Sequence, residues 1–156
     1  MIKEIESRRS IRRYKDIPVK EELIEEILKA GMLAPSSKNR QPWHFIVTTG
    51  SAKEQVLKAM EAGLKREEKQ PFLPESAPYL DGARATLKIM KEAPVIIFIT
   101  DPLASPMDQP LAVDERVSEI CNAQSVGAAI ENMTLAATEL GLGSLWICNT
   151  FLLRKN

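Results

Sequence analysis

Hydrophobic residues recur every three to four positions along residues 18–33 and again from Val56 to Leu64, with charged and polar residues between them. This spacing is typical of helices that bury one face. Ser51 and Glu54 match a capping box at the start of the second stretch, and Asp114 can cap a later helix, which Gly141 ends. The pattern predicts helices over residues 18–33, 51–65, 83–91 and 114–140.

Three shorter stretches are typical of strands. Pro94 to Ile99 is a continuous apolar run, as expected of a central strand buried on both faces, and His44 to Thr49 and Ser144 to Cys148 are further candidates. Arg66 to Asp81 carries three prolines among charges and is expected to be a mobile loop that could cover a ligand. By itself, the alternation of helices and strands favours a parallel βαβ sheet.

Length and charge restrict the class of protein. With 156 residues, the chain is expected to form a single domain over residues 1–156. Lys plus Arg and Asp plus Glu both total 21, so no net charge favours nucleic acid or an anionic membrane. The N-terminus lacks the apolar segment of a secretory signal, and no apolar run approaches the roughly 20 residues that span a bilayer. We therefore expect a cytoplasmic protein with no membrane or nucleic-acid partner.

Few side chains offer metal or nucleophile chemistry. Cys121 and Cys148 are far apart without a CxxC spacing, so two buried free thiols are expected. His44 is the single histidine, which argues against a histidine-based metal site, and we expect a structural role for it. The phosphate-binding glycine motifs, HExxH and GxSxG do not occur in the sequence, so an enzyme of this kind would rely on an organic cofactor.

Four arginines lie within six residues in the segment Arg8-Arg9-Ser10-Ile11-Arg12-Arg13. Unpaired charges are costly to bury, so these side chains face either water or an anion. The planar guanidinium can bind phosphate through two parallel hydrogen bonds, and the serine adds a neutral donor. An exposed basic patch paired with neighbouring glutamates is the alternative. Nucleic-acid binding is a lesser one, because no set of stacking aromatic residues accompanies the arginines.

A polar turn over residues 35–41 follows the first predicted helix. It brings together two serines, an asparagine and a glutamine, whose hydroxyl and amide groups can read the edge of a heterocycle or a polyhydroxyl chain. Serine, asparagine and proline are also ordinary turn formers, so the turn alone leaves both interpretations open.

Small residues from Ser125 to Ala129 interrupt the last predicted helix. They permit close backbone approach, and Gly127 lowers helix propensity by up to about 1 kcal/mol relative to alanine. A crowded helix crossing within the chain and a helix at the centre of a dimer both account for this run.

Four segments, in order and with matching spacing along nearly the whole chain, resemble the FMN-dependent nitroreductase family. They are residues 8–14, 34–45, 127–133 and 139–146. The resemblance implies an α+β, nitroreductase-like fold in which a mostly antiparallel central sheet is flanked by helices. It also implies a homodimer with FMN at the subunit interface, so the turn of one subunit serves the flavin whose phosphate is held by the arginines of the other.

The resemblance also implies which residues bind the cofactor. The arginine segment corresponds to phosphate and ribityl contacts, the turn to contacts from the second subunit, and the segment after the last helix to backbone beside the flavin ring. The implied cofactor-binding residues are Arg8, Arg9, Ser10, Arg12, Pro35, Ser36, Ser37, Asn39, Gln41, Gly143, Ser144 and Leu145.

The activity implied by the resemblance is a ping-pong oxidoreduction. NADH or NADPH passes hydride to the flavin, and a nitroaromatic, a quinone or a similar small acceptor then takes the electrons. No catalytic side chain and no metal is expected. A flavin-binding or sensing protein of the same fold, without turnover, is the alternative function.

The family pattern extends beyond the last residue of this sequence. The resemblance implies a further core strand, a basic phosphate contact and a segment that embraces the partner. We therefore expect a C-terminally short domain, in which Arg154 and Lys155 are candidates to replace the phosphate contact.

Overall fold

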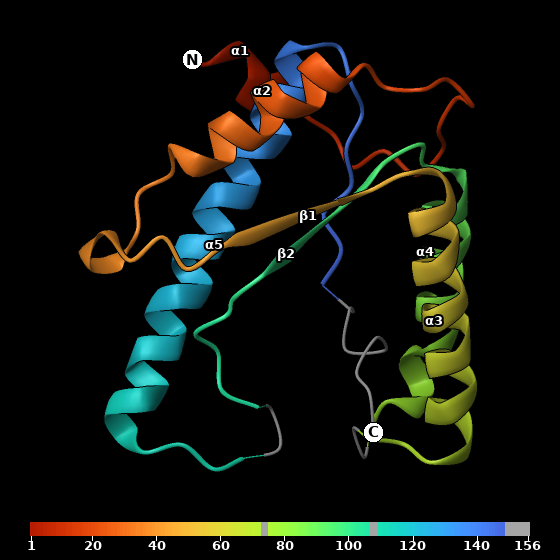
Figure 1. Cartoon of the computed structure of the whole chain (residues 1–156), viewed down its shortest axis with the longest axis vertical. Coiled ribbons are helices and arrows are strands. Elements are labelled where there is room, and N and C mark those ends of the chain that lie inside the picture. The colour runs from red at the N-terminus through yellow and green to blue at the C-terminus, as the bar shows by residue number, and fades with distance from the viewer. Residues whose placement is uncertain (73–74, 107–108, 149–156) are drawn as a thin grey trace. The chain divides into compact units, whose positions relative to one another are not determined.

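The structure is a computed structural model that describes residues 1–72, 75–106 and 109–148. Figure 1 shows its helices and strands. Two short 3-10 helices are named η1 and η2. In chain order the elements are α1 (Lys3–Ser7), α2 (Glu21–Met32), η1 (Ser37–Asn39), β1 (His44–Thr48), α3 (Gly50–Lys69), η2 (Ala77–Tyr79), α4 (Leu80–Glu92), β2 (Ile96–Thr100) and α5 (Val113–Glu139).

The chain is organised as two compact units. The first comprises residues 1–10, 19–46 and 97–144 and contains α1, α2, η1 and α5. The second comprises residues 11–18, 47–96 and 145–156, and its described part contains α3, η2 and α4.

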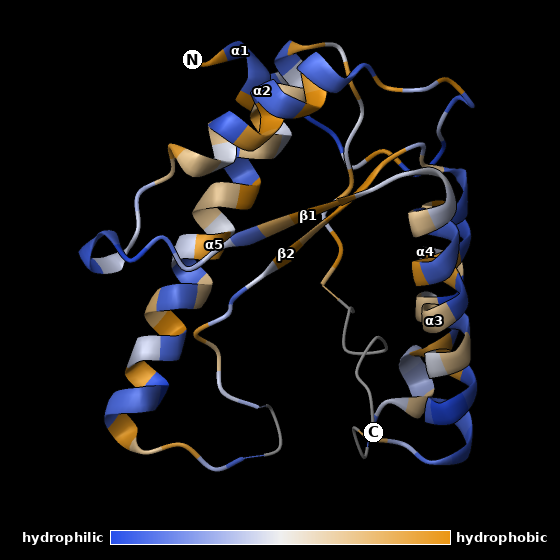
Figure 2. Cartoon of the chain, viewed as in Figure 1, coloured by the Kyte–Doolittle hydropathy of each residue, from blue (hydrophilic) through white to orange (hydrophobic). Residues whose placement is uncertain are grey.

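Helix α5 organises the first unit, because α1, α2 and η1 all contact it. Its buried residues include Asn122, Ser125, Ala129, Met133 and Ala137, which are three and four positions apart and so form one stripe. Hydrophobic and hydrophilic residues nevertheless alternate along the whole of α5 in Figure 2, rather than separating into two faces. The predicted close packing of the small-residue run is confirmed at Ala129, which is fully buried.

The crossing of α2 and α5 is tight at Gly31. A Cβ atom at this position would lie 2.9 Å from Met133 Cγ and 3.0 Å from Phe45 Cζ. Met133 belongs to the buried core of the unit, and Phe45 packs against that core. The glycine therefore allows the two helices to approach closely.

Replacing Gly31 by alanine is expected to lower the free energy of unfolding by about 1–3 kcal/mol, because the methyl group overpacks the crossing. Gly82 in α4 is the matched control, since a Cβ there meets nothing within 4 Å. Gly82→Ala should stabilise the protein by about 0.5–1 kcal/mol through helix propensity. Urea unfolding followed by circular dichroism measures both changes. Equal effects of the two substitutions would contradict the close approach at Gly31.

The two strands form an antiparallel pair. Thr48 Oγ1, at the end of β1, donates to Ile96 O at the start of β2 (3.0 Å), and Thr100 Oγ1 donates to His44 O (3.4 Å). The pairing confirms the antiparallel arrangement implied by the family resemblance and shows that the parallel βαβ pattern is wrong. The physical reason is that two helices, α3 and α4, separate the strands, and a helical hairpin returns the chain to the side from which it left.

Helices α3 and α4 pack against each other in the second unit. Lys53 Nζ, in the first turn of α3, donates to the carbonyl oxygens of Lys91 (3.3 Å) and Ala93 (2.8 Å) at the end of α4. A cation at a helix C-terminus satisfies its last carbonyl groups and complements its dipole. This contact closes the hairpin.

The predicted loop over residues 66–81 is wrong at both ends, and residues 73–74 lie outside the described part. Helix α3 continues to Lys69, and η2 and α4 begin before Asp81. Glu67 is 3% exposed, and its carboxylate accepts hydrogen bonds from Phe72 N (3.0 and 3.1 Å) and Ser76 Oγ (2.7 Å). The buried carboxylate therefore fixes the backbone that follows α3.

Several other local predictions are corrected. Helix α3 starts after Thr49 without a side-chain cap, so Ser51 does not form the predicted capping box. Helix α5 is preceded by Ala112, whose N–H donates to Glu115 Oε2 (2.8 Å), in place of the predicted Asp114 cap. The residues of β2 are only partly buried, because the described sheet has two strands. In the described part of residues 144–148, the predicted strand reduces to a single bridge at Ser144.

Candidate anion and cofactor site

Arg8 follows α1 and reaches the side of α5. Its Nε lies 3.6 Å from Glu131 Oε1, and the side chains of the pair are 34% and 46% exposed. Among the described residues, neither terminal nitrogen of Arg8 has a hydrogen-bond partner. The guanidinium is thus partly buried, held on one edge, and able to present its two terminal nitrogens to an anion.

Arg9 is used differently. It is exposed, and its Nη1 donates to the carbonyl oxygens of Glu6 and Arg8, at 2.7 Å each. These oxygens lie at the end of α1, and the last turn of this helix contains no basic residue. Arg9 therefore closes α1, and the two adjacent arginines have separate roles in the structure.

Ser10 of the arginine segment lies beside Ser144 in the segment that follows α5. Ser10 and Ser144 form an isolated parallel bridge within the first unit. The bridge brings together two predicted cofactor-binding segments that are far apart in the sequence. Gly143 is exposed, whereas Ser144 is partly buried.

Arg12 and Leu145 belong to the second unit. Arg12 is exposed, and Leu145 is partly buried. Burial raises the pKa of Tyr14, and the nearby charge of Arg12 opposes this effect. The hydroxyl of Tyr14 donates to Ile11 O (2.9 Å), so a hydrogen bond fixes the backbone around Arg12.

The polar turn is strained. Lys38, Asn39 and Gln41 have φ angles of 53°, 52° and 47°, in the left-handed region. This conformation costs an L-residue other than glycine about 1–2 kcal/mol, and such residues cluster at ligand-binding sites. Pro35, Asn39 and Gln41 are exposed, and Pro42 directly after them is fully buried. The turn thus presents its amide side chains outward from a fixed base.

Serine hydroxyl groups hold the turn in place. Ser36 Oγ accepts from Gln41 N (3.0 Å). Ser37 N donates to Ser125 Oγ on α5 (3.1 Å), and that hydroxyl donates to Cys121 O (2.7 Å). Ser36 and Ser37 are both partly buried, so part of their hydrogen-bonding capacity maintains the turn itself.

Replacing Ser36 by alanine is expected to release Gln41 N and to lower the free energy of unfolding by about 1 kcal/mol. Ser51→Ala is the control, because the structure shows no capping bond from this exposed serine. Its effect should stay within about 0.5 kcal/mol. Thermal unfolding of both variants tests the role of the turn, and equal shifts would argue against it.

The turn and the arginine segment contact α5 at different places. The anchors are Ser125 and Glu131, which are six residues apart, or about 9 Å along the helix axis. Figure 1 shows η1 standing out from the middle of α5, with α1 near its C-terminal end. The structure therefore brings Arg8 to Ser10 together with Ser144, and leaves the turn as a separate candidate surface.

Two residues that support these segments carry no local sequence signal of this role. Ser125 belongs to a run of small residues, and Glu131 belongs to a family-like segment. Ser125 contacts Ser37, which is 88 positions away in the sequence, and Glu131 contacts Arg8, which is 123 positions away. No local pattern encodes such contacts.

The remaining candidate chemistry is limited. Cys121 and Cys148 are free, as predicted, but Cys121 is only partly buried and Cys148 is exposed, so the predicted burial is wrong. The described residues contain no group of three or more His, Cys, Asp or Glu arranged to hold a metal ion. They also contain no helix with the length and apolar character needed to cross a membrane.

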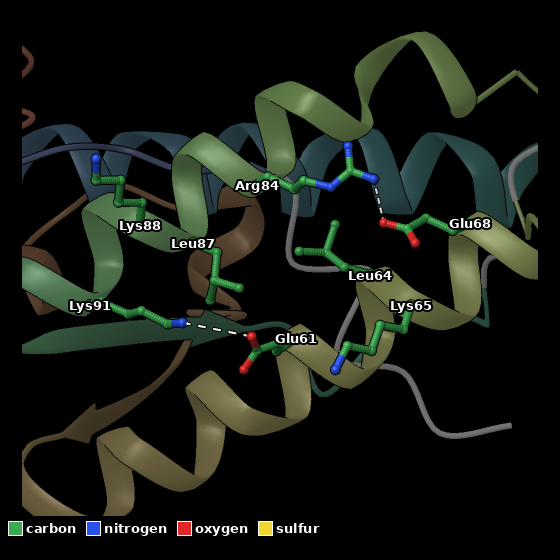
Figure 3. Close-up of a pocket in the computed structure, with 8 residues that line it drawn as sticks. All are labelled: Glu61, Leu64, Lys65, Glu68, Arg84, Leu87, Lys88 and Lys91. Atoms are coloured by element: carbon green, nitrogen blue, oxygen red, sulfur yellow. Dashed lines mark hydrogen bonds and ion pairs between the residues drawn. The ribbon is translucent and has the colours of Figure 1, made fainter.

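A groove of about 310 Å³ lies between α3 and α4 and contains none of the predicted cofactor residues. Figure 3 shows Arg84 pointing to Glu68 and Lys91 pointing to Glu61, with Lys91 Nζ 3.9 Å from Glu61 Oε1. The hydrogen bond that Arg84 donates to Glu68 raises the pKa of Arg84. These exposed ion pairs tie the two helices together, and we assign them a structural role.

The antiparallel strands, the flanking helices and the half-buried arginine beside the Ser10–Ser144 bridge define an α+β protein with a candidate anion-binding site. The profile of the nitroreductase family matches residues 5–152. The chain belongs to this family.

Individual relatives and solved structures agree with the family match. A provisionally named NADH dehydrogenase/NAD(P)H nitroreductase from Archaeoglobus fulgidus is 36% identical over 146 residues, which are 94% of this chain and 66% of the relative. A provisionally named nitroreductase from Desulfovibrio desulfuricans, solved in complex with FMN, is 31% identical with a TM-score of 0.66, over 94% of this chain and 67% of that one. An FMN-dependent nitroreductase from Clostridium difficile is 31% identical with a TM-score of 0.63, and the match covers 97% of this chain and 69% of that one. This chain therefore spans about two thirds of the length of these proteins.

Proposed function

We propose that the protein binds FMN and acts as an oxidoreductase that passes electrons from NADH or NADPH to a nitroaromatic, a quinone or a similar small acceptor. The observation that carries this proposal is the Ser10–Ser144 bridge, because it joins the candidate phosphate-binding segment to the candidate ring-binding segment. The FMN complex of the D. desulfuricans protein, at 31% identity, supports the same cofactor here.

The donor chemistry of the described residues fits this cofactor. Arg8 offers two terminal nitrogens to a phosphate, and Ser10, two residues further along the chain, carries a hydroxyl group. Gly143 and Ser144 offer main-chain groups for the flavin ring. The turn offers Pro35, Ser36, Ser37, Asn39 and Gln41, and the assignments of Arg9, Arg12 and Leu145 rest on the family pattern.

We propose that the turn serves the flavin held by a second copy of the chain in a homodimer. Within one chain, the turn and Arg8 occupy different places along α5. Helix α5 also exposes apolar residues one turn apart, with Val113 80%, Val117 53% and Ile120 51% exposed. A stripe of this kind on a central helix favours burial in a symmetric dimer.

When bound, FMN supplies the two-electron redox chemistry, which alternates between the nucleotide and the acceptor in a ping-pong sequence. The residues of the protein would bind FMN and orient it. Arg8 would neutralise negative charge on the phosphate and Ser10 would add a neutral hydrogen-bond donor, main-chain N–H groups near Ser144 would stabilise negative charge on the ring, and the turn would contribute polar contacts. We assign no proton transfer to a side chain.

Two measurements test the proposed function. Titration with FMN, followed by flavin fluorescence, should show saturable binding. The FMN-loaded protein should then oxidise NADH or NADPH when a nitroaromatic or quinone is present. Binding without nucleotide oxidation would instead support a flavin-binding or sensing protein, and a protein that binds no flavin would contradict both functions.

A further inference from the structure

Glu131 is the acidic residue on α5 that pairs with the arginine segment. We propose that Glu131 is a positioning residue that holds Arg8 with its two terminal nitrogens directed to the phosphate of the cofactor. This inference rests on the proposed FMN-binding function. It adds a residue that lies outside the set of cofactor contacts.

The carboxylate of Glu131 is fixed from both sides. Its Oε1 lies 3.6 Å from Arg8 Nε, and its Oε2 accepts a hydrogen bond from Thr134 Oγ1 (2.9 Å). Thr134 is 7% exposed and one helical turn further along α5, and its hydroxyl shares its one proton between Glu131 Oε2 and Glu131 O (3.0 Å), which holds it in place. The two oxygens thus have separate partners, and the buried threonine sets the direction from which the carboxylate meets Arg8.

The edge of the Arg8 guanidinium that Glu131 contacts determines which N–H donors remain available to bind an anion. A guanidinium carries five N–H donors in a rigid plane. Because Glu131 faces Nε, the end of the fork, which comprises Nη1 and Nη2, stays free to bind phosphate through two parallel bonds. An arginine held in this way also has less rotamer freedom to lose when the anion binds.

Arg9 lies next to Arg8 in the sequence but is not positioned to bind a phosphate in the same way. Its Nη1 is already bound to two main-chain oxygens, so its fork does not present a free end. Glu131 therefore distinguishes Arg8 from its neighbour in a segment where the sequence alone treats the arginines as equivalent.

The test compares FMN with riboflavin, which lacks the phosphate. Glu131→Ala is expected to raise the dissociation constant for FMN about 5- to 10-fold and to leave that for riboflavin within about twofold, because only the phosphate contact is affected. Glu131→Gln keeps an acceptor oxygen for Arg8 Nε and should hold FMN affinity within about threefold of wild type. In an Arg8→Ala background, Glu131→Ala should cause no further change in the FMN-to-riboflavin ratio.

Glu139 supplies the matched control, since it is an exposed carboxylate near the end of α5. Glu139→Ala should bind both flavins as the wild type does. Equal weakening of FMN and riboflavin by Glu131→Ala would show a general structural role and overturn the proposal, as would unchanged binding of FMN. Wild-type protein that binds neither flavin would overturn the proposed function and, with it, the role of Glu131.

Discussion

Arg8→Ala is expected to raise the dissociation constant for FMN about 10- to 100-fold and to change that for riboflavin by no more than about twofold. The reason is that Arg8 is the arginine of the first unit whose terminal nitrogens have no partner among the described residues. A charge-assisted contact to phosphate contributes about 1.5–3 kcal/mol, and riboflavin has no phosphate to lose. Fluorescence titration with each flavin measures the two constants directly.

Arg13→Ala is the control for Arg8, because it removes the same charge from an exposed residue of the same sequence segment. It should change FMN affinity by less than about twofold at moderate ionic strength. If both substitutions weakened FMN equally, the arginines would act only through their summed charge. The specific geometry at Glu131 would then be irrelevant to binding.

The second large effect is expected at the exposed apolar stripe of α5. Val117→Glu combined with Ile120→Glu should convert a homodimer into monomers, because each substitution buries an unpaired carboxylate in the interface. Sedimentation velocity measures the change in mass. FMN affinity should fall in the same variant, since the turn of the partner no longer reaches the cofactor.

A control adds the same charges elsewhere. Gln55→Glu combined with Ala59→Glu places two carboxylates on the exposed face of α3. This variant should sediment as the wild type does. A wild-type protein that is monomeric at all concentrations, or a stripe variant that stays dimeric, would contradict the proposed interface.

The sequence predicted helices better than it predicted their ends. The apolar period and the capping and stop residues located four helices, yet α3 runs to Lys69, four residues beyond the predicted end at Lys65. The prolines that follow residues 66–69 favour a loop over these charged residues. The charged residues are good helix formers, and Glu67 turns inward to bind Phe72 and Ser76. Such a buried carboxylate depends on tertiary contacts that no local pattern contains.

The relative direction of the two strands also could not be predicted from the spacing of apolar residues. Alternating helices and strands favoured a parallel sheet, and only the family resemblance pointed to antiparallel pairing. The two predicted helices between the strands were the available signal, because a hairpin of helices returns the chain beside Thr48.

The sequence predicted which segments form the candidate site. It did not predict the contacts that hold these segments in place. Residue types identified the arginine segment and the turn, and the structure pairs Ser10 with Ser144. It also distinguishes Arg8 from Arg9, because one pairs with Glu131 and the other closes α1. Sequence patterns could not separate these roles, since the role of Arg8 depends on a contact with α5 that lies 123 positions away in the sequence.

Anaerobic mixing of FMN-loaded protein with NADH or NADPH, before any acceptor is added, tests directly whether the protein is an FMN-dependent oxidoreductase. At least one of the two nucleotides is expected to bleach the visible absorbance of the bound flavin, and a nitroaromatic or quinone added afterwards should restore it. Bound flavin that neither nucleotide reduces would contradict the proposed oxidoreductase function.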